Sequence, residues 1–185
     1  LTVLPGMVQH FDISREKSVR AVETAMMGDQ KVYLVTQRNP QQEVPTAADL
    51  YQMGTVSQIK QIVKMPNGIL RVMVEGLERA ALLTLFEDGQ YLEAEIEDAP
   101  MQEEQLSDTV KEAMSRIVKE KLEEFGNANP KAVKDFIGSL LVITDLEPLL
   151  TQTANEFPWD FAVKQELLEC DYVSHLYDRI VYYLM

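Results

Sequence analysis

The chain has 185 residues, of which 46% are hydrophobic and 25% charged, a composition typical of folded globular domains rather than disordered chains. Its formal net charge is −13, and acidic residues outnumber basic ones on both sides of Pro100. Because binding to a phosphate backbone depends on Lys and Arg, this balance disfavours a nucleic-acid partner. No apolar run approaches the roughly 20 residues of a membrane-spanning helix, so no membrane partner is expected.

The chain ends indicate whether the sequence is part of a larger protein, and its cysteine content indicates the cellular compartment. The sequence begins at Leu1 without the basic and apolar segments of a signal peptide, and a helical pattern still runs at Met185. Both ends are therefore expected to be cut from a larger protein. Cys170 is the only cysteine and cannot form an internal disulfide, which favours a reducing, cytoplasmic compartment.

The first predicted element is a helix that Ser14 caps and Gly28 ends. It is indicated by apolar residues at helical spacing, namely Val19, Val22 and Met26. Residues 31–36 (KVYLVT) are rich in β-branched and aromatic side chains and predict a buried strand. Residues 39–46 contain two prolines among polar residues and predict a loop, and residues 49–50 a short turn.

A β-hairpin is the strongest local prediction. Residues 56–65 alternate in part between apolar and polar side chains and predict the first strand, which Pro66 ends. The following Asn67-Gly68 is typical of a type I′ turn. The return strand, residues 69–75, places three apolar side chains on one face: Leu70, Val72 and Val74. Gly76 is predicted to mark a bend.

Two further strands are predicted at residues 80–86 and 91–97, joined by a turn at Asp88-Gly89. In the second of them Glu93, Glu95 and Glu97 alternate with apolar residues, so one face is expected to be wet. Several short strands with tight turns indicate a small antiparallel barrel or sandwich over residues 1–100.

The sequence period changes to a helical one after Pro100, and residues 101–185 are predicted to form an all-α bundle. The first helix is predicted to end at Gly126. It is indicated by an amphipathic stripe of Leu106, Val110, Met114, Ile117, Lys121 and Phe125, supplemented by Ala113, Val118 and Leu122. Asn129-Pro130 predicts a new helix start, with a buried face made of Val133, Phe136, Ile137 and Leu140.

Three more helices complete the predicted bundle. Asp145 is expected to cap one that stops before Pro158, residues 159–170 form the next, and Asp171 is expected to cap the last. Their buried faces are predicted from Leu146, Leu149 and Leu150 in the first, and from Val173, Leu176, Ile180 and Leu184 in the last. The whole chain is thus predicted to be α+β, with a β-rich part followed by a helical part.

The residue types needed for catalysis are sparse and scattered. His10 and His175 are the only histidines, and no sequence-near base or basic cluster accompanies Cys170. No CxxC, HExxH or GxxxxGK[ST] motif occurs, and the carboxylate runs at residues 93–98 and 103–104 are explained by strand alternation and by a helix start. We therefore predict no catalytic, cofactor-binding or metal-binding residue, and no enzyme activity for this chain by itself.

The candidates for binding are flexible apolar side chains. Methionine recurs on surfaces that accept varied apolar partners, although it also fills gaps in cores, and this alternative stays open. Four residues are expected at loop-like or outward-facing positions and are the candidates for binding an apolar partner: Met7, Phe11, Met65 and Met73.

Several separate motifs then carry a resemblance to a known family. The stretches VLPGMVQHFDISREKSVRAVETAM, KVYLVTQRN and DLYQMGTVSQIKQIVKMPNGILRVMVEGLERAAL resemble the N-terminal domain of bacterial ATP-dependent Lon proteases over residues 3–86. The most specific parts are Pro5, the REKS segment from Arg15, GTV from Gly54, the PNG turn and VEGLER from Val74. The helical half resembles the family chiefly through KQELLE at residues 164–169. His10 and Ser14 depart from the family's usual proline and glycine.

The resemblance implies a β-rich, PUA-like pseudo-barrel with one inserted helix, followed by a helical subdomain. It further implies a non-catalytic domain that recognises unfolded, damaged or tagged protein substrates and aids assembly of a homo-hexamer. The parent protein implied is a cytoplasmic, ATP-dependent serine protease with a Ser–Lys dyad and an AAA+ ATPase, which would bind ATP and Mg outside this chain.

Three alternatives remain open at this point. The first is a structural or assembly module that mediates subunit contacts. The second is a stand-alone adaptor or small-ligand binder built from this domain alone. The third is an RNA-binding barrel, which the charge balance opposes.

Overall fold

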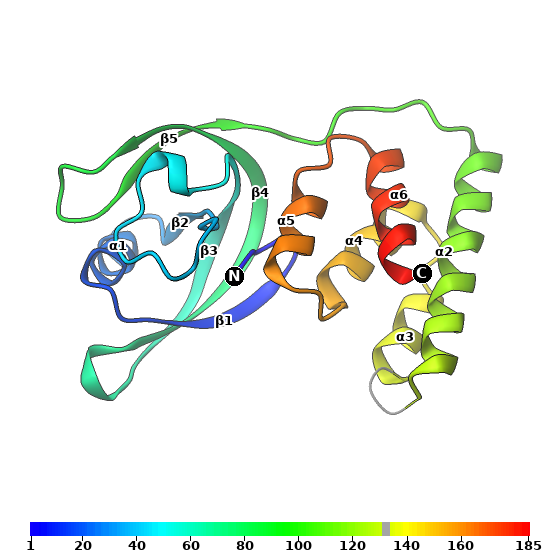
Figure 1. The fold of residues 1–185 in the computed structure, drawn as a ribbon, viewed down its shortest axis with the longest axis horizontal. Coiled ribbons are helices and arrows are strands. Elements are labelled where there is room, and N and C mark those ends of the chain that lie inside the picture. Colours follow the sequence, from blue (N-terminus) through cyan, green and yellow to red (C-terminus); the bar gives the residue numbers. More distant parts are fainter. Residues whose placement is uncertain (131–133) are drawn as a thin grey trace. The chain divides into compact units, whose positions relative to one another are not determined.

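The computed structural model describes residues 1–130 and 134–185 and contains, within them, a five-stranded antiparallel sheet and six α-helices (Figure 1). The predicted α+β class is confirmed. The chain divides into two compact units, one of residues 1–100 and 160–168 and the other of residues 101–159 and 169–185. No helix among the described residues is long and apolar enough to cross a membrane.

The sheet is built around one long strand. Its strands are β1 (Val8–Ile13), β2 (Lys31–Leu34), β3 (Met53–Lys64), β4 (Leu70–Phe86) and β5 (Glu93–Asp98), in the order β1-β4-β3-β2. β4 pairs with β1 along residues 70–75 and with β5 along residues 80–86, so one strand serves two partners in succession. Figure 1 shows β4 curving between them. Among the described strands, β1, β2 and β5 each have one paired neighbour and form edges.

Gly76 lies inside β4, so the predicted division of this segment into two strands is wrong. The glycine is required by close packing, because a Cβ built there would lie 2.2 Å from the Leu4 carbonyl oxygen. Its N–H donates to the Met7 carbonyl, and its own carbonyl accepts from Gly6. The β3 register shifts opposite this point, between Val56 and Ser57, so a bulge takes up the irregularity and the strand continues.

The β3–β4 hairpin has the predicted backbone but a longer loop. Asn67 and Gly68 both have positive φ, 66° and 75°, which confirms the conformation expected of Asn-Gly. The loop, however, is closed by Met65, whose N–H donates to the Ile69 carbonyl at 2.8 Å. A two-residue turn would need a donor at Pro66, and proline has no N–H.

The core face of the sheet follows the predicted alternation. Leu70, Val72 and Val74 are at most 4% exposed, and Ile59 of β3 joins them. β2 was expected to be buried, but its side chains are exposed or half-buried because this short strand lies at a sheet edge.

Helix α1 (Glu16–Met26) begins one residue later than predicted. Its N-cap is Arg15, whose carbonyl accepts from Val19, so Ser14 lies too early to act as the cap. The predicted stop is confirmed, because the Gly28 N–H donates to the Ala25 carbonyl just beyond the last turn.

Helix α5 (Phe161–Leu168) packs with the β-rich unit, although the boundary predicted at residue 100 assigned it to the helical part. The Gln165 side-chain amide donates to the Met53 carbonyl of β3 at 3.0 Å. The Thr2 hydroxyl donates to the Phe161 carbonyl. A late segment of the chain thereby stabilises the N-terminal sheet.

The other unit contains α2 (Asp108–Ala128), α3 (Lys134–Leu141), α4 (Leu146–Glu156) and α6 (Val173–Leu184). The buried faces predicted for α4 and α6 are confirmed at Leu146, Leu149 and Leu150 and at Leu176, Ile180 and Leu184, whereas Val173 is half-buried. In α3 Ile137 and Leu140 are buried as predicted and Phe136 is half-buried, whereas Val133 lies outside the described residues.

The buried stripe of α2 is narrower than predicted. Met114, Val118 and Leu122 are buried, whereas Val110 and Ile117 are 45% and 39% exposed. The two sets form neighbouring stripes on one helix, and only the first faces the other helices of its unit. Sequence spacing alone does not choose between adjacent apolar stripes.

Three predicted helix ends in this unit are wrong. Gly126 lies within α2, where an added Cβ would meet the Ile137 side chain at 3.3 Å, so close helix packing explains this glycine. Asn129 is the C-cap of α2 rather than a new N-cap, and its side-chain amide donates to the Phe125 carbonyl. Tyr172, not Asp171, is the N-cap of α6.

Candidate functional site

The residues considered for catalysis are divided between the two units, with His10 in one and Cys170 and His175 in the other. His10 is exposed on β1, and His175 is exposed on α6 with its ring 5.0 Å from that of Tyr172. Cys170 is half-buried and belongs to the helical unit. Within residues 1–130 and 134–185, no group of three or more His, Cys, Asp or Glu side chains is placed to hold a metal ion.

A different surface emerges from the register of β1, β4 and β3. Residues that pair directly across an antiparallel sheet place their side chains on the same face. We call the face that points away from the core the outer face. It has three rows of side chains: Val8–Glu75–Gln58, His10–Met73–Gln61 and Asp12–Arg71–Val63.

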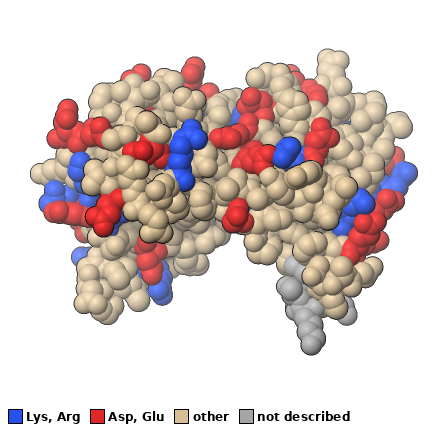
Figure 2. Space-filling view, viewed as in Figure 1, with Lys and Arg blue, Asp and Glu red and all other residues tan. Residues whose placement is uncertain are grey.

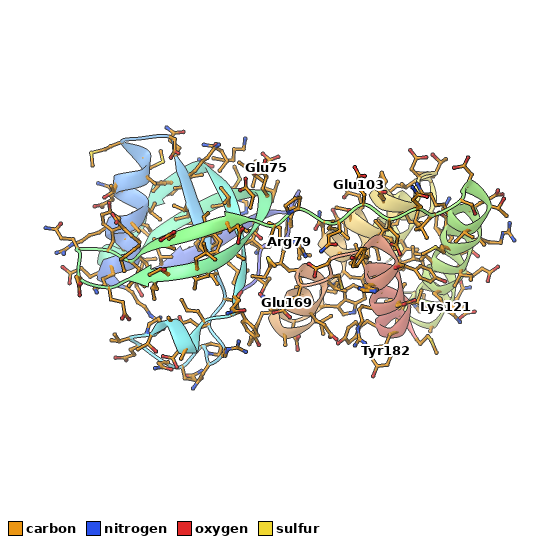
Figure 3. The ribbon with its side chains drawn as sticks, turned by 90° about the horizontal axis from the view of Figure 1, so that it is seen from above. Glu75, Arg79, Glu103, Lys121, Glu169 and Tyr182 are labelled. Carbon is orange, nitrogen blue, oxygen red and sulfur yellow. The ribbon has the colours of Figure 1, made fainter. Side chains whose placement is uncertain are left out.

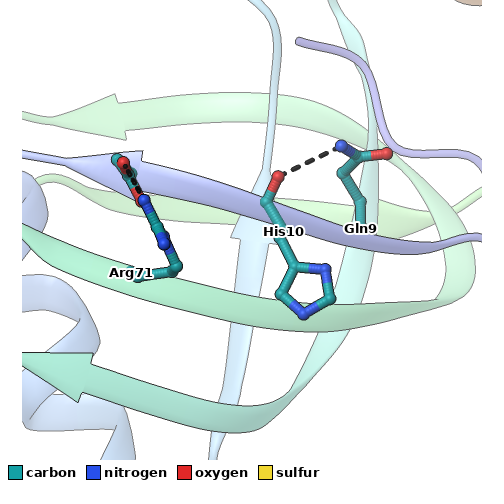
Figure 4. Close-up of polar contacts among 4 residues, drawn as sticks. Gln9, His10 and Arg71 are labelled. Atoms are coloured by element: carbon teal, nitrogen blue, oxygen red, sulfur yellow. Dashed lines mark hydrogen bonds and ion pairs between the residues drawn. The ribbon is translucent and has the colours of Figure 1, made fainter.

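The charges on the outer face are paired. The Arg71 guanidinium donates to both carboxylate oxygens of Asp12, at 2.9 and 3.1 Å (Figure 4). This hydrogen bonding lowers the pKa of Asp12 below its usual value and raises the pKa of Arg71. Lys60, at a bulge in β3, lies 3.0 Å from the Glu75 carboxylate. In a chain of net charge −13, this surface is locally neutral.

Three apolar side chains cross the outer face diagonally, one from each strand. Val8 of β1 is 58% exposed, Met73 of β4 is half-buried, and Val63 of β3 is 41% exposed. Diagonal neighbours on a sheet are close enough for long side chains to touch. The stripe thus offers apolar area between two ion pairs, while Figure 2 shows acidic side chains spread among uncharged ones on the face that it displays.

The four residues predicted to bind substrate do not form one patch. Met73 lies on the outer face and Met65 is half-buried at the start of the hairpin loop. Phe11 pairs with Val72, so it lies on the core face of the sheet, where it is half-buried.

The outward position expected for Met7 is wrong, because this side chain is only 9% exposed. Its N–H donates to the Leu4 carbonyl, which closes a turn just before β1.

Sequence reasoning missed Val8 and Val63, together with the two ion pairs. The alternation of Val8, His10 and Asp12 was available as a signal for one face of a strand. The pairing of that strand with β4, which brings Arg71 to Asp12, depends on a register that a single sequence does not reveal.

The VEGLER motif has a structural explanation in Arg79, which is only 7% exposed. Figure 3 labels this residue. Its Nε donates to the Ala99 carbonyl at 2.6 Å, and its Nη1 donates to the Leu168 carbonyl at 3.0 Å. A buried cation at the C-terminal end of α5 also suits the helix dipole. Arg79 therefore fastens α5 and the end of β5 to the β-rich unit.

The helical unit carries two other surface features. An open groove of about 770 Å³ runs between α2 and the start of α4 and is lined by charges of both signs, including Lys111, Arg116, Glu120 and Glu147. The second feature is Tyr182 of α6, which does not line this groove: it is 62% exposed, and the Arg179 guanidinium lies 5.0 Å from its ring centroid.

The chain was compared with known protein families and sequences. The family model described as the ATP-dependent protease La (LON) substrate-binding domain matches residues 1–185. A Lon protease of Lachnoclostridium phytofermentans is 36% identical over 180 residues, which cover 97% of this chain and 22% of that protein. Lon protease 1 of Bacillus subtilis is 31% identical over 181 residues, covering 98% and 23% respectively. The chain thus spans less than a quarter of the length of these curated relatives.

Solved structures show the same fold. The N-terminal domain of the Mycobacterium avium complex Lon protease matches with a TM-score of 0.70 and 20% identity, covering 99% of this chain and 92% of that chain. A Lon N-terminal domain protein from Xanthomonas campestris matches with a TM-score of 0.64 and 11% identity, covering 98% and 92%. The family model and the sequence relatives agree with this likeness, and the chain belongs to the family of the Lon substrate-binding domain.

Proposed function

We propose that this chain captures unfolded, damaged or tagged polypeptides for a Lon-type ATP-dependent protease. The observation that carries the proposal is the stripe of Val8, Met73 and Val63, which lies exposed between paired charges. Unfolded proteins expose the apolar segments that native proteins bury, and an apolar surface without net charge favours contact with them. The family model, described as a substrate-binding domain, supports the same assignment.

Peptide-bond cleavage and ATP hydrolysis are assigned by this proposal to the rest of a parent protein. The relatives are named Lon protease, and the chain covers 22% of the Lachnoclostridium protein. In such a parent a Ser–Lys dyad would cleave the client, and an AAA+ module with ATP and Mg would deliver it. A cytoplasmic homo-hexamer is the expected assembly, and this chain itself is proposed to use no cofactor.

Binding to a permanently unfolded protein tests the proposal. A reduced, carboxymethylated and fluorescently labelled client is titrated with the chain, and fluorescence anisotropy gives the Kd. The test variant combines Val8→Ser, Val63→Ser and Met73→Gln on the outer face. A matched control, Val110→Ser with Ile117→Ser, removes comparably exposed apolar side chains from α2.

The outer-face variant is expected to weaken client binding about tenfold, a change equivalent to about 1.4 kcal/mol. The α2 control is expected to keep the wild-type Kd, and the native form of the client is expected to bind more weakly than the unfolded form. Equal affinity of both variants, or equal binding of native and unfolded client, would contradict the proposal.

A role in assembly is the second candidate, and the exposed Tyr182 beside Arg179 favours it, because Tyr and Arg are enriched at protein interfaces. Tyr182→Ser in a full-length parent would then shift sedimentation towards smaller species while the Kd for the client stayed unchanged. A stand-alone adaptor is the remaining alternative, and the complete reading frame decides it, because a stop codon soon after Met185 supports the adaptor.

A further inference from the structure

The edge of β1 opposite β4 carries a row of backbone groups with no strand beside it among the described residues. The Gly76 N–H donates to the Met7 carbonyl, so Met7 directs its carbonyl towards β4. Backbone groups alternate in direction along an antiparallel strand. Val8, His10 and Asp12 therefore direct their N–H and C=O groups towards the open edge.

One contact confirms this direction. The His10 carbonyl accepts a hydrogen bond from the side-chain amide of the neighbouring Gln9 at 3.1 Å (Figure 4). A backbone carbonyl bonded by the adjacent side chain, rather than by another strand, belongs to the unpaired side of its strand. The Gln9 amide occupies the position that the N–H of an added strand would take.

The sheet edges differ in how they are protected. Exposed edges are commonly blunted by short length, by unpaired charges or by proline. β2 has only four residues and begins at Lys31, and β5 carries Glu93, Glu95 and Glu97 on an exposed face. β1 has six residues, contains no proline, and its one charged residue, Asp12, is paired with Arg71.

Apolar side chains of β1 lie beside the open edge, on the core face of the sheet. Phe11 and Ile13 pair with Val72 and Leu70 and therefore share their face, yet both remain half-buried. A strand added beside β1 would place alternate side chains next to them. Main-chain hydrogen bonds would then supply affinity, and the half-buried apolar pair would select apolar residues at every second position.

We propose that β1 holds the client by adding an extended client segment to the sheet as an antiparallel strand along residues 8–12. The segment has β-branched or other apolar residues at alternate positions and no net negative charge. This inference rests on the proposed function, because it specifies how the client is bound.

The experiment uses a labelled peptide of alternating valine and threonine and two backbone N-methylated forms of it with equal numbers of methyl groups. With valine towards Phe11 and Ile13, the threonine N–H groups face β1 and the valine N–H groups face away. Methylation at threonine is expected to weaken binding at least about tenfold, because several hydrogen bonds are lost. Methylation at valine is expected to leave the Kd within about twofold, because those N–H groups make no bond to β1.

Two protein variants complete the test. His10→Pro removes an N–H from the open edge without removing a bond to β4, and it is expected to reproduce the loss seen on threonine methylation. Gln9→Ala frees the His10 carbonyl and is expected to tighten peptide binding about two- to threefold, a change that does not depend on the proline variant folding.

Equal effects of the two methylation patterns would overturn the inference, and so would weaker binding by Gln9→Ala. Pairing of β1 with a second copy, detected as a dimer that His10→Pro abolishes while the peptide fails to bind, would overturn it as well. If the carboxymethylated client binds through the outer face but the peptide does not bind, this inference fails while the proposed function stands.

Discussion

At Gly76 a hydrogen atom occupies the space that a methyl group would need. Because a Cβ there would lie 2.2 Å from the Leu4 carbonyl oxygen, and both groups are backbone, neither can yield without moving the chain. Gly76→Ala is expected to lower the free energy of unfolding by about 1–3 kcal/mol, or more if the bulge is lost, measured by urea denaturation. Gly138→Ala in α3, where no atom lies within 4 Å of the added Cβ, is the control and is expected to be neutral or slightly stabilising. Equal stability of Gly76→Ala and the wild type would contradict the packing argument.

The Asp12–Arg71 pair makes a prediction about pH. Hydrogen bonding to Arg71 lowers the pKa of Asp12 in the folded state, so this pair contributes stability above the usual aspartate range and loses it as pH falls through the lowered pKa. In Arg71→Gln the pKa of Asp12 is expected to rise towards the ordinary value of an aspartate. An NMR titration of the Asp12 side-chain carboxyl measures this change. An unchanged pKa would show that the pair is not formed in solution.

At the scale of an element, a side chain distant in sequence caps α6. The Glu104 carboxylate accepts from the Ser174 N–H at 3.0 Å and from the Ser174 hydroxyl at 2.5 Å. These hydrogen bonds lower the pKa of Glu104, so its contribution to stability is present above the usual glutamate range and is lost as pH falls through the lowered pKa. Glu104→Gln is therefore expected to lower the thermal midpoint at neutral pH, and the difference from wild type should shrink in acid.

The neighbouring Glu103→Gln is the control for this prediction, because Glu103 is exposed and has no capping contact. Circular dichroism at several pH values measures both variants. The cap would be refuted by a Glu104→Gln midpoint that matches the control at neutral pH.

The buried face of a strand or helix was predictable from sequence where the local spacing of apolar residues determines it. The alternation of Leu70, Val72 and Val74 gave the core face of β4, and the spacing of Leu146, Leu149 and Leu150 gave the buried face of α4. Ends and bends were not predictable in the same way. Gly76 and Gly126 are needed for close packing against distant segments, which sequence reasoning interprets as a bend and a stop.

The candidate surface was predictable only in part, for a related reason. Met73 was placed correctly because its strand is readable from alternation. Phe11 and Met7 were not, since the face that a side chain occupies depends on the register of β1 and on the turn at Leu4. Register is set by long-range pairing, which a single sequence does not encode locally.

At the scale of the whole molecule, α5 completes a unit that lies mostly in the first half of the chain. A fragment of residues 1–100 lacks the bonds from Gln165 to Met53 and from Arg79 to Leu168. We expect its sheet to unfold at a lower temperature than in the full chain, because the buried Arg79 guanidinium loses a charged hydrogen bond worth about 1.5–3 kcal/mol. The far-UV circular dichroism signal of β-structure, followed during heating, measures the unfolding midpoint of the sheet. An unchanged midpoint would show that α5 contributes nothing to the β-rich unit.

The surface proposed to bind clients is locally neutral, although the molecule as a whole is acidic. The net charge of the chain is −13, whereas the paired charges around Val8, Met73 and Val63 leave the outer face without net charge. The helical unit has its own exposed residues, including Tyr182, so the two units offer distinct candidate surfaces. We therefore expect clients to bind the sheet rather than the helices.

Hydrogen–deuterium exchange of the 185-residue chain, with and without the carboxymethylated client, tests this claim most directly. We expect client-dependent protection of backbone amides in β1 and along the β3–β4 hairpin, with little change in α2, α3, α4 and α6. Protection confined to those helices, or no protection at saturating client, would contradict the account.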